Sequence, residues 1–425
     1  MENNLTGSAG WISFFSTFIR VAFFCILVKG ETRRWLTREV LLISFSAFFA
    51  DLGYQTIVGL FPIVVKFLLR QPAYIFGILM AMTYGIGSII SYAGGRLGDR
   101  YSKKKLAVGG NLLITLLSLS GLPGNLVESS ALYLGGWWSR DFRSPIRRAL
   151  LVEISDPGYR SRIFGFLHSL DVGGGMLSTV IAFVLLYSGF GVPLVMLVMI
   201  IPILMSSVVL SMVSEDRHKN FTDSRPPPDN EKEINASSMK LFLISAGLFG
   251  FSYYSLGFPI ITIAAAEHNY AMGLLSYTIF LGVSGLTGYI LGSSALKAVS
   301  GLWKFGYSVS AIGSLLIGIS YQFNLGLPAF YLSIAILGFG TGSIETFEPV
   351  VASILTPSAR ISRGMGSLSA WRGIGLFSSN IFMGILFTFS VFDSYVYAFL
   401  TAIAAALLMW MVQRRTSSLR ERNIS

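Results

Sequence analysis

The chain has 425 residues, of which 53% are apolar and 12% charged, and its formal net charge is +11. Soluble globular proteins carry charge on about 25% of their residues, so this composition excludes a soluble fold and indicates a membrane protein. The positive charges lie in short clusters between long apolar runs, which is the pattern that sets membrane topology, so we do not expect nucleic acid as a partner.

The first apolar segment, residues 11–29, is atypical because Arg20 lies in its middle. Its polar residues recur at helical spacing, and an amphipathic helix on the inner membrane surface explains them. A further membrane-spanning helix is the alternative, although an arginine at mid-bilayer is costly without a partner.

From residue 40 onward the apolar runs are long enough to cross a bilayer, which takes about 20 residues. Those before the polar, proline-bearing segment cover residues 40–65, 73–94, 105–123, 127–149, 163–188 and 192–213. Those after it cover residues 240–264, 271–296, 303–321, 327–350, 363–389 and 392–413. The sequence therefore predicts an all-α membrane protein with twelve transmembrane helices.

The distribution of Lys and Arg predicts the orientation. They collect on one side, in the inner loops and at both ends of the chain, while the opposite connections carry only Lys66 and Arg70. The positive-inside rule then predicts a multi-pass protein of the cell membrane with both termini cytoplasmic. Its expected parts are a cytoplasmic N-terminal segment with the surface helix (1–39), a six-helix bundle (40–213), a cytoplasmic linker (214–239), a second six-helix bundle (240–413) and a cytoplasmic tail (414–425).

The two halves repeat one another. The Phe-Pro pair at residues 61–62 matches the pair at 258–259, at an offset of 197, and Gly165 matches Gly366 at an offset of 201. Both halves begin inside and have six spans, so the repeat is parallel, about an axis along the membrane normal. This arrangement is typical of transporters that rock two bundles against each other.

The loop between the second and third predicted spans carries a charged signature. It reads Gly95-x-Leu97-x-Asp99-Arg100-x-x-Lys103-Lys104 and resembles the loop signature of the major facilitator superfamily, with Ser102 where a second glycine is usual. Arg140 in the fourth span resembles the intramembrane arginine of that family, and residues 143–166 resemble a prokaryotic branch of it. The resemblance covers residues 40–413. It implies the major facilitator fold, in two pseudo-repeated six-helix bundles, and a small-molecule substrate. We expect a monomer in the lipid bilayer.

The resemblance also implies a role for the loop that begins at Gly95. Asp99 would accept hydrogen bonds from the first amides of the eleventh span and latch the two halves on the inner side, which stabilises the outward-open state. Arg100, or Arg140 and Arg143 of the fourth span, would compete for this acid. The alternative is a basic loop that only sets topology, which explains the cations but not Asp99.

Polar residues within the spans are the candidates for binding, because a charge inside the bilayer is costly and by default faces a cavity or a partner. Asp51, halfway along the first span, is the first candidate for binding a proton or the substrate. An acid that is hydrogen-bonded to a neighbouring helix is the alternative. Gln55 lies one turn later on the same face and would extend a polar cavity wall.

Further candidates lie in the fifth, tenth and eleventh spans. Asp171 corresponds to Arg372 by the offset of 201, which indicates one central charged position in each half. His168 is a candidate proton relay. Glu345 is a candidate coupling site, whereas Glu348, three residues later on the same face, lies nearer the inner surface and is expected to pair with Arg360 or Arg363. Three further residues are expected to line a cavity: Tyr84, Asn111 and Asn380.

These features predict a secondary active transporter that works by alternating access and draws on a proton gradient. No GxxxxGK[ST] loop is present, so ATP is not the expected energy source, and we expect no cofactor. One cysteine and three histidines leave no residues for a Cys/His metal cluster, and we do not expect an enzyme. Efflux of lipophilic compounds is favoured over uptake of a sugar or carboxylate. A transport-inactive sensor is the remaining alternative.

Overall fold

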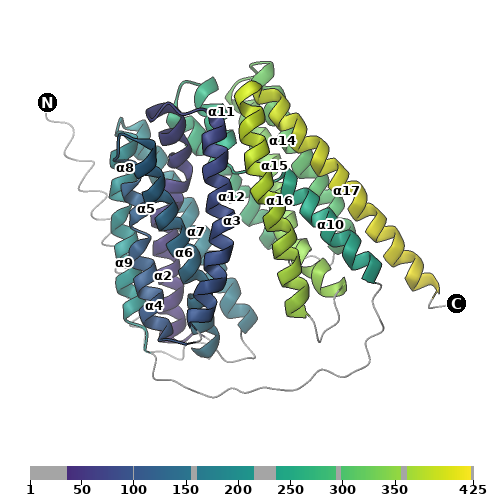
Figure 1. Cartoon of the computed structure of the whole chain (residues 1–425), viewed down its shortest axis with the longest axis horizontal. Coiled ribbons are helices and arrows are strands. Elements are labelled where there is room, and N and C mark those ends of the chain that lie inside the picture. Colours follow the sequence, from purple (N-terminus) through teal and green to yellow (C-terminus); the bar gives the residue numbers. More distant parts are fainter. Residues whose placement is uncertain are drawn as a thin grey trace.

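The fold is known from a computed structural model. The structure describes residues 36–98, 100–154, 160–214, 236–292, 298–355 and 361–422. Within these ranges all regular elements are helices, joined by short turns, and Figure 1 shows them running side by side in two groups. The all-α prediction is confirmed for this part of the chain.

The helices of the first half correspond to the six predicted spans. They are α2 (Arg38–Ile63) with the π-helical turn η1 (Val64–Leu68), α3 (Ala73–Gly98), α4 (Lys103–Leu113) with α5 (Leu116–Leu119), α6 (Leu126–Ile154), α7 (Arg160–Tyr187), and α8 (Val192–Val198) with α9 (Ile200–Ser211). Asp99, the predicted latch acid, and residues 11–29 lie outside the described residues, so both remain predictions.

The helices of the second half follow the same order. They are α10 (Ala236–Ser252) with α11 (Gly257–Ala266), α12 (Tyr270–Gly292), α13 (Ala298–Gly301) with η3 (Leu302–Tyr307) and α14 (Ser308–Gln322), α15 (Leu327–Leu355), α16 (Ile361–Phe389) and α17 (Val391–Arg422). The half begins at Ala236, inside the predicted linker. The predicted span 240–264 is not continuous, because the helix is interrupted between α10 and α11.

Ten helical segments of the described ranges are long and apolar enough to cross a membrane. The other two predicted spans are residues 105–123, which fold as the short helices α4 and α5, and residues 127–149, which lie in α6. α6 is 29 residues long but carries Arg140, Asp141, Arg143 and Arg147 in its second half. Its length fits a bilayer, and its charges require partners within the protein.

The first half is built around α2. The Thr37 side chain caps its N-terminus by accepting a hydrogen bond from the Val40 amide at 3.3 Å, and most of its residues are buried. Glycines allow neighbouring helices to approach it closely: a Cβ on Gly174 of α7 would lie 2.4 Å from the Phe48 carbonyl oxygen, and one on Gly53 would lie 2.3 Å from the Ile203 side chain. The predicted role of the α7 glycines in close helix packing is thus confirmed for Gly174.

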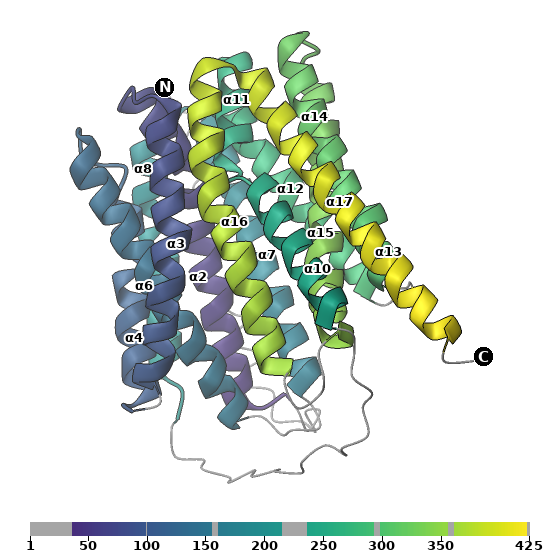
Figure 2. The ribbon, with the colours of Figure 1, turned by 45° about the vertical axis from the view of Figure 1, so that its right-hand side comes forward.

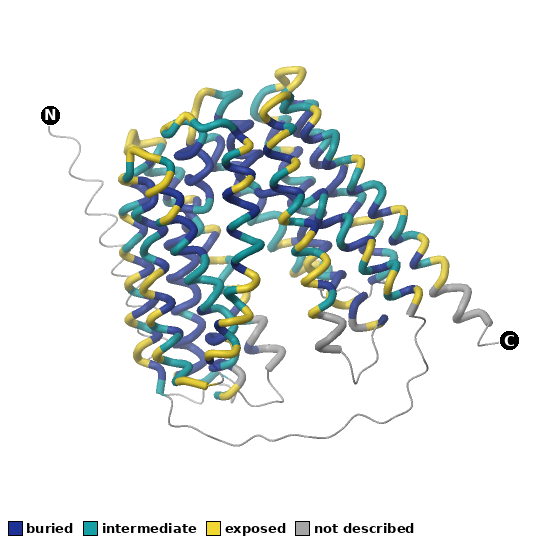
Figure 3. Tube along the Cα trace, in the orientation of Figure 1, coloured by how far each residue is buried: buried dark blue, intermediate teal, exposed yellow. Residues whose placement is uncertain are grey.

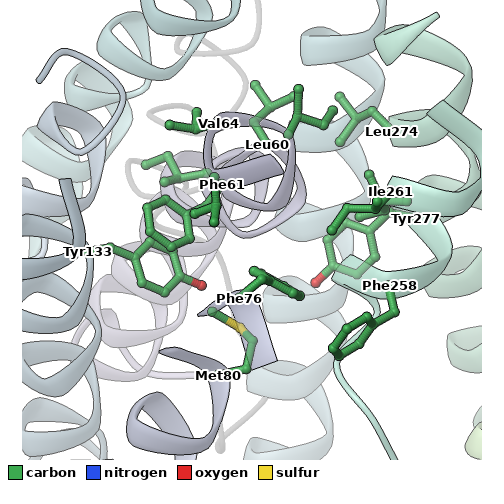
Figure 4. Packing of buried hydrophobic residues seen from close by; sticks show 14 of the residues in the cluster. Leu60, Phe61, Val64, Phe76, Met80, Tyr133, Phe258, Ile261, Leu274 and Tyr277 are labelled. Atoms are coloured by element: carbon green, nitrogen blue, oxygen red, sulfur yellow. The ribbon is translucent and has the colours of Figure 1, made fainter. Parts of the chain in front are cut away.

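One hydrophobic cluster joins the two halves. It lies away from the end at which residues 214 and 236 flank the linker, which we call the linker end. Figure 4 shows residues of both halves in it, and they include Leu60, Phe61, Phe76, Phe258, Leu274 and Tyr277. Phe61 stacks on Tyr133 with ring centroids 3.7 Å apart, and Phe76 meets Phe258 edge-on at 5.2 Å. We call this cluster the seal, because burying it holds the halves together at the end opposite the linker.

The contact between α3 and α16 extends the seal. A Cβ on Gly77 would lie 2.3 Å from the Asn380 carbonyl oxygen and 3.0 Å from the Gly384 Cα, so the two backbones touch. The Tyr74 amide donates a hydrogen bond to the Thr388 hydroxyl at 3.2 Å. These contacts lie at the end opposite the linker.

Nearer the linker end, α3 and α16 pack within their own halves. A Cβ on Gly94 of α3 would lie 2.4 Å from the Phe142 carbonyl oxygen of α6, and one on Gly375 of α16 would lie 2.3 Å from the Gly247 carbonyl oxygen of α10. Figure 1 and Figure 2 show the ribbons of the two halves meeting at one end and diverging toward the linker end. Figure 3 shows buried positions running through the inside of both halves, with exposed positions along the outer faces and turns.

Candidate functional site

Asp51 lies in the middle of α2 and is 5% exposed. Its Oδ1 accepts a hydrogen bond from the Tyr54 hydroxyl at 2.5 Å and another from the Gln55 amide nitrogen at 3.2 Å. Both donors are on α2 itself, one turn further along. The predicted burial of Asp51 is therefore confirmed, and its hydrogen bonds are made within its own helix rather than to a neighbouring one.

Arg140 of α6 lies beside this acid. Its guanidinium donates to Asp141 Oδ1 at 2.8 Å and to the Tyr54 hydroxyl at 3.5 Å. It also lies over the rings of Trp137 and Tyr54, 4.9 and 5.4 Å from their centroids. Arg140 was expected to compete for Asp99, but in this structure Tyr54 connects it to Asp51. The sequence offered no signal for Tyr54 beyond its place on the same helix.

Gln55 connects Asp51 to the second half. Its side-chain oxygen accepts a hydrogen bond from the hydroxyl of Tyr277 on α12 at 2.8 Å, while its nitrogen donates to Asp51 at 3.2 Å. The predicted polar wall therefore includes a residue of the other half, which the sequence did not indicate. Tyr277 itself belongs to the seal.

Asp171 of α7 pairs with Arg147 of α6. The Arg147 Nη2 and Asp171 Oδ2 are 3.4 Å apart, and the two side chains are 6% and 23% exposed. Asp171 was a predicted site residue, whereas Arg147 was not among the candidates. Whether Asp171 meets Arg372 could not be read from the sequence; here each binds a partner in its own half.

Arg372 of α16 binds two acids of α15. Its Nη1 is 3.1 Å from Glu348 Oε2, and its Nη2 donates to Glu345 Oε1. Glu348 is fully buried and also accepts a hydrogen bond from the Tyr307 hydroxyl at 2.7 Å. Its expected place near the inner surface was wrong, because it packs into the core of the second half. Glu345 is 57% exposed and is held through Arg372.

Arg143 is 1% exposed, the most deeply buried arginine of the described residues. Its Nε and Nη1 atoms have no hydrogen-bond partner there. A Cβ on Gly110 of α4 would lie 3.0 Å from the Arg143 Cβ, so the side chain leaves α6 toward α4. In this structure Arg143 lies inside the first half.

The remaining candidates lie at the linker end. Gly95 is in the last turn of α3, and Arg100 is exposed in the turn before α4, with its amide bonded to the Leu97 carbonyl at 3.0 Å. His168 of α7 is exposed. Lys103 pairs with Glu153 of α6 at 2.8 Å, which ties the loop to its own half.

The interruption between α10 and α11 is stabilised from outside. The Ser255 amide donates to the Asn380 side-chain oxygen at 2.9 Å, and the Phe251 carbonyl accepts from the Tyr397 hydroxyl at 2.5 Å. Backbone groups freed inside a bilayer need such partners. Asn380 was expected to line a cavity and instead supports this break.

The other two expected lining residues differ. Asn111 is fully buried and donates to Ser206 and Ser207 at 2.9 and 2.8 Å, so it ties α4 to α9. Tyr84 packs edge-on against Trp137, with centroids 5.7 Å apart, and therefore lies near Arg140. The described residues contain no group of three or more His, Cys, Asp or Glu that could hold a metal ion.

Comparison with known proteins agrees with this architecture. A sequence model described as the Major Facilitator Superfamily matches residues 43–303. An uncharacterized MFS-type transporter of Methanocaldococcus jannaschii is 21% identical over 407 residues, which are 90% of this chain and 97% of the relative.

Solved transporter structures share the fold at low sequence identity. The nucleoside transporter NupG superposes with a TM-score of 0.68 at 13% identity, over 89% of this chain and 99% of that one. A bacterial homologue of the human lysosomal transporter Spinster, in an inward-facing and occupied conformation, gives 0.67 at 11% identity, over 90% and 98%. The POT family transporter PepTSo gives 0.67 at 12% identity, over 89% and 99%.

Proposed function

The chain belongs to the Major Facilitator Superfamily, and from that premise we propose that it is a secondary active transporter driven by a proton gradient. Membership of the family and the transporter fold establish a multi-pass membrane protein that moves a solute. The coupling ion, the direction and the substrate are the proposed part.

The observation that carries proton coupling is the setting of Asp51. A buried carboxylate is costly inside a bilayer, so it either keeps its partners or takes up a proton. Asp51 keeps one partner, Tyr54, that also contacts Arg140, and another, Gln55, that contacts the second half. Its protonation therefore affects groups on both sides of the boundary between the halves, which is what coupling requires.

The orientation supports alternating access. The positive-inside rule assigns the linker end to the cytoplasm, with both termini on that side. The seal and the contact between Gly77 and Gly384 then lie toward the outer face. On this assignment the present arrangement is closed to the outside, and transport requires a second arrangement in which these contacts open.

Aromatic side chains surround the charged centre and suggest the substrate class. Tyr54, Tyr84, Tyr133 and Trp137 form edge-on or stacked pairs close to Arg140. We propose that a monomer exports lipophilic compounds through this region. The solved relatives are named as nucleoside and peptide transporters, so the fold does not select one substrate class. Uptake of a sugar or carboxylate and a transport-inactive sensor are the alternatives.

Reconstitution into proteoliposomes tests the proposal. Flux of fluorescent lipophilic cations, nucleosides, dipeptides and sugars is measured with and without an imposed pH gradient. We expect the gradient to accelerate flux in the wild type and not in Asp51→Asn, while exchange of substrate at equilibrium persists. Glu128→Gln, which removes an exposed acid at the start of α6, is the matched control.

Two outcomes would contradict this function. Gradient-driven flux that is unchanged in Asp51→Asn would show that Asp51 does not couple protons. Absence of flux for every compound in the wild type, with binding retained, would favour the sensor.

A further inference from the structure

A chain of hydrogen bonds runs from the charged centre to the other half. Tyr54 donates to Asp51 at 2.5 Å, Gln55 donates to the same Asp51 oxygen at 3.2 Å, and Tyr277 donates to Gln55 at 2.8 Å. Three of these residues are on α2, and Tyr277 is on α12. Gln55 thus uses one side-chain atom toward Asp51 and the other toward the second half.

Both ends of the Gln55–Tyr277 contact are tightly packed. A Cβ on Gly175 of α7 would lie 3.1 Å from the Gln55 Cγ. A Cβ on Gly59 of α2 would lie 2.5 Å from the Leu274 side chain and 3.1 Å from the Tyr277 ring. The two glycines allow α2 to be approached from both sides, so neither side chain can shift far without moving a helix.

The charge of Asp51 fixes which way the Gln55 amide points. An ionised carboxylate only accepts hydrogen bonds, so the amide N–H₂ must face Asp51 and the carbonyl oxygen must face Tyr277, whose hydroxyl then donates. A protonated Asp51 loses the charge-assisted bond, which is roughly twice as strong as a neutral one, and gains a proton of its own to donate. That proton competes with the Tyr277 hydroxyl for the Gln55 oxygen.

Tyr277 is well placed to pass such a change on. It is 6% exposed and belongs to the seal, next to Leu274 (Figure 4). The seal is apolar, so its stability depends on close packing rather than on charge. A shift of Tyr277 therefore changes the packing that holds the halves together at the end opposite the linker.

We propose that Gln55 and Tyr277 transmit the protonation state of Asp51 to the seal: the ionised acid keeps the seal closed, and protonation loosens it. This inference rests on the proposed function of Asp51 as the proton site. The charged groups that act on Asp51 are Arg140 and Arg147 of α6 and Asp171 of α7, with the phenol of Tyr54 on its own helix. Gln55 and Tyr277 are accordingly positioning residues that act through Asp51 and bind no proton themselves.

Tyr277→Phe tests the proposal because it removes one hydroxyl and keeps the ring. Tyr254→Phe is the matched control, since Tyr254 is a buried tyrosine of the same half whose hydroxyl bonds to Ser314 within that half, at 3.0 Å. Gln55→Leu is a second variant that removes both hydrogen bonds. Each is measured in the full-length chain in lipid nanodiscs.

The readout is the distance between spin labels on Tyr74→Cys and Phe389→Cys, in a Cys25→Ser background. Both sites are exposed, at 39% and 85%, and they lie at the ends of α3 and α16 that meet beside the seal. In the wild type we expect acid pH to raise the population with the longer distance. Tyr277→Phe and Gln55→Leu should reduce this pH response at least twofold, and Tyr254→Phe should leave it unchanged.

The outcomes separate the inference from the function on which it rests. If Asp51→Asn abolishes the pH response and Tyr277→Phe and Gln55→Leu retain it in full, the inference is wrong and the role of Asp51 stands. If Asp51→Asn also retains the response, both are wrong. A loss of response in Tyr254→Phe equal to that in Tyr277→Phe would assign the effect to packing and overturn the inference.

Discussion

Arg147 and Glu348 occupy equivalent places in the two halves, 201 positions apart, and they carry opposite charges. Each pairs with the residue 24 positions further along the chain: Arg147 with Asp171, and Glu348 with Arg372. The same ion pair therefore occurs in both halves with its charges inverted. In each half the first member is nearly or fully buried and its partner is about a quarter exposed, so the halves present an acid and a cation at matching places.

Removing the charge of Asp171 should destabilise the protein more than its own exposure suggests. Asp171→Asn leaves Arg147, which is 6% exposed, without its counter-charge, and breaking a buried pair costs about 3–5 kcal/mol. The 3.4 Å separation and the partial exposure of Asp171 favour the lower end of this range. Denaturant unfolding in detergent measures the loss. The double variant Arg147→Met/Asp171→Leu should recover most of it, and a single variant as stable as the wild type would contradict the pairing.

The second half should tolerate the equivalent change better. Glu348→Gln keeps a group that can bond Tyr307, and Arg372 keeps Glu345, so we expect a loss of about 1.5–3 kcal/mol, the value of a hydrogen bond to a charged group. Tyr307→Phe should cost about 1 kcal/mol. The same unfolding assay ranks the variants, and a larger loss in Tyr307→Phe than in Glu348→Gln would contradict this order.

A methyl group at Gly77 should disturb the contact between the halves. In Gly77→Ala the new Cβ meets the backbone oxygen of Asn380 at 2.3 Å, and overpacking of this kind costs about 1–3 kcal/mol. We expect the spin-label distance at the ends of α3 and α16 to lengthen and the transport rate to fall by roughly tenfold, which corresponds to about 1.4 kcal/mol.

Gly109→Ala is the control for this change, because a Cβ there meets nothing within 4 Å. In a helix this substitution should be neutral or stabilise by about 0.5–1 kcal/mol. Equal effects of the two substitutions on transport would show that close approach at Gly77 is not required.

Lysine should not replace arginine at position 140. Arg140→Lys keeps the charge but loses the planar group that lies over Trp137 and Tyr54, contacts worth about 0.5–2 kcal/mol each. We expect the maximal transport rate to fall by roughly tenfold, as about 1.4 kcal/mol implies, with folding retained. Arg148→Lys, on the exposed side of the same helix, should behave as the wild type. Normal transport by Arg140→Lys would mean that only the charge matters.

The number and limits of the helices could be predicted because bilayer thickness dictates the length of an apolar run. The partner of a buried charge could not, since it depends on how each helix is rotated against its neighbour. Glu348 illustrates this, because its place along α15 indicated the inner surface while its direction is into the core. Arg147 could have been found by applying the offset of 201 to Glu348.

The interruption between α10 and α11 was also beyond reach. The sequence from 240 to 264 is continuously apolar, and the groups that satisfy the free backbone come from Asn380 and Tyr397, more than 120 positions away. A local pattern cannot show a partner that distant. Asp51, by contrast, was found because an acid at the centre of an apolar run is conspicuous whatever its neighbours.

The charges of α6 affect how the chain enters the membrane during synthesis. A charged residue near the centre of an isolated helix costs about 2.5–3.5 kcal/mol in insertion by the translocon, and α6 carries Arg140, Asp141, Arg143 and Arg147. The counter-charge of Arg147 is Asp171 on α7, which is translated later. α6 is therefore expected to wait at the translocon until α7 emerges, and the two helices would partition into lipid together as a hairpin.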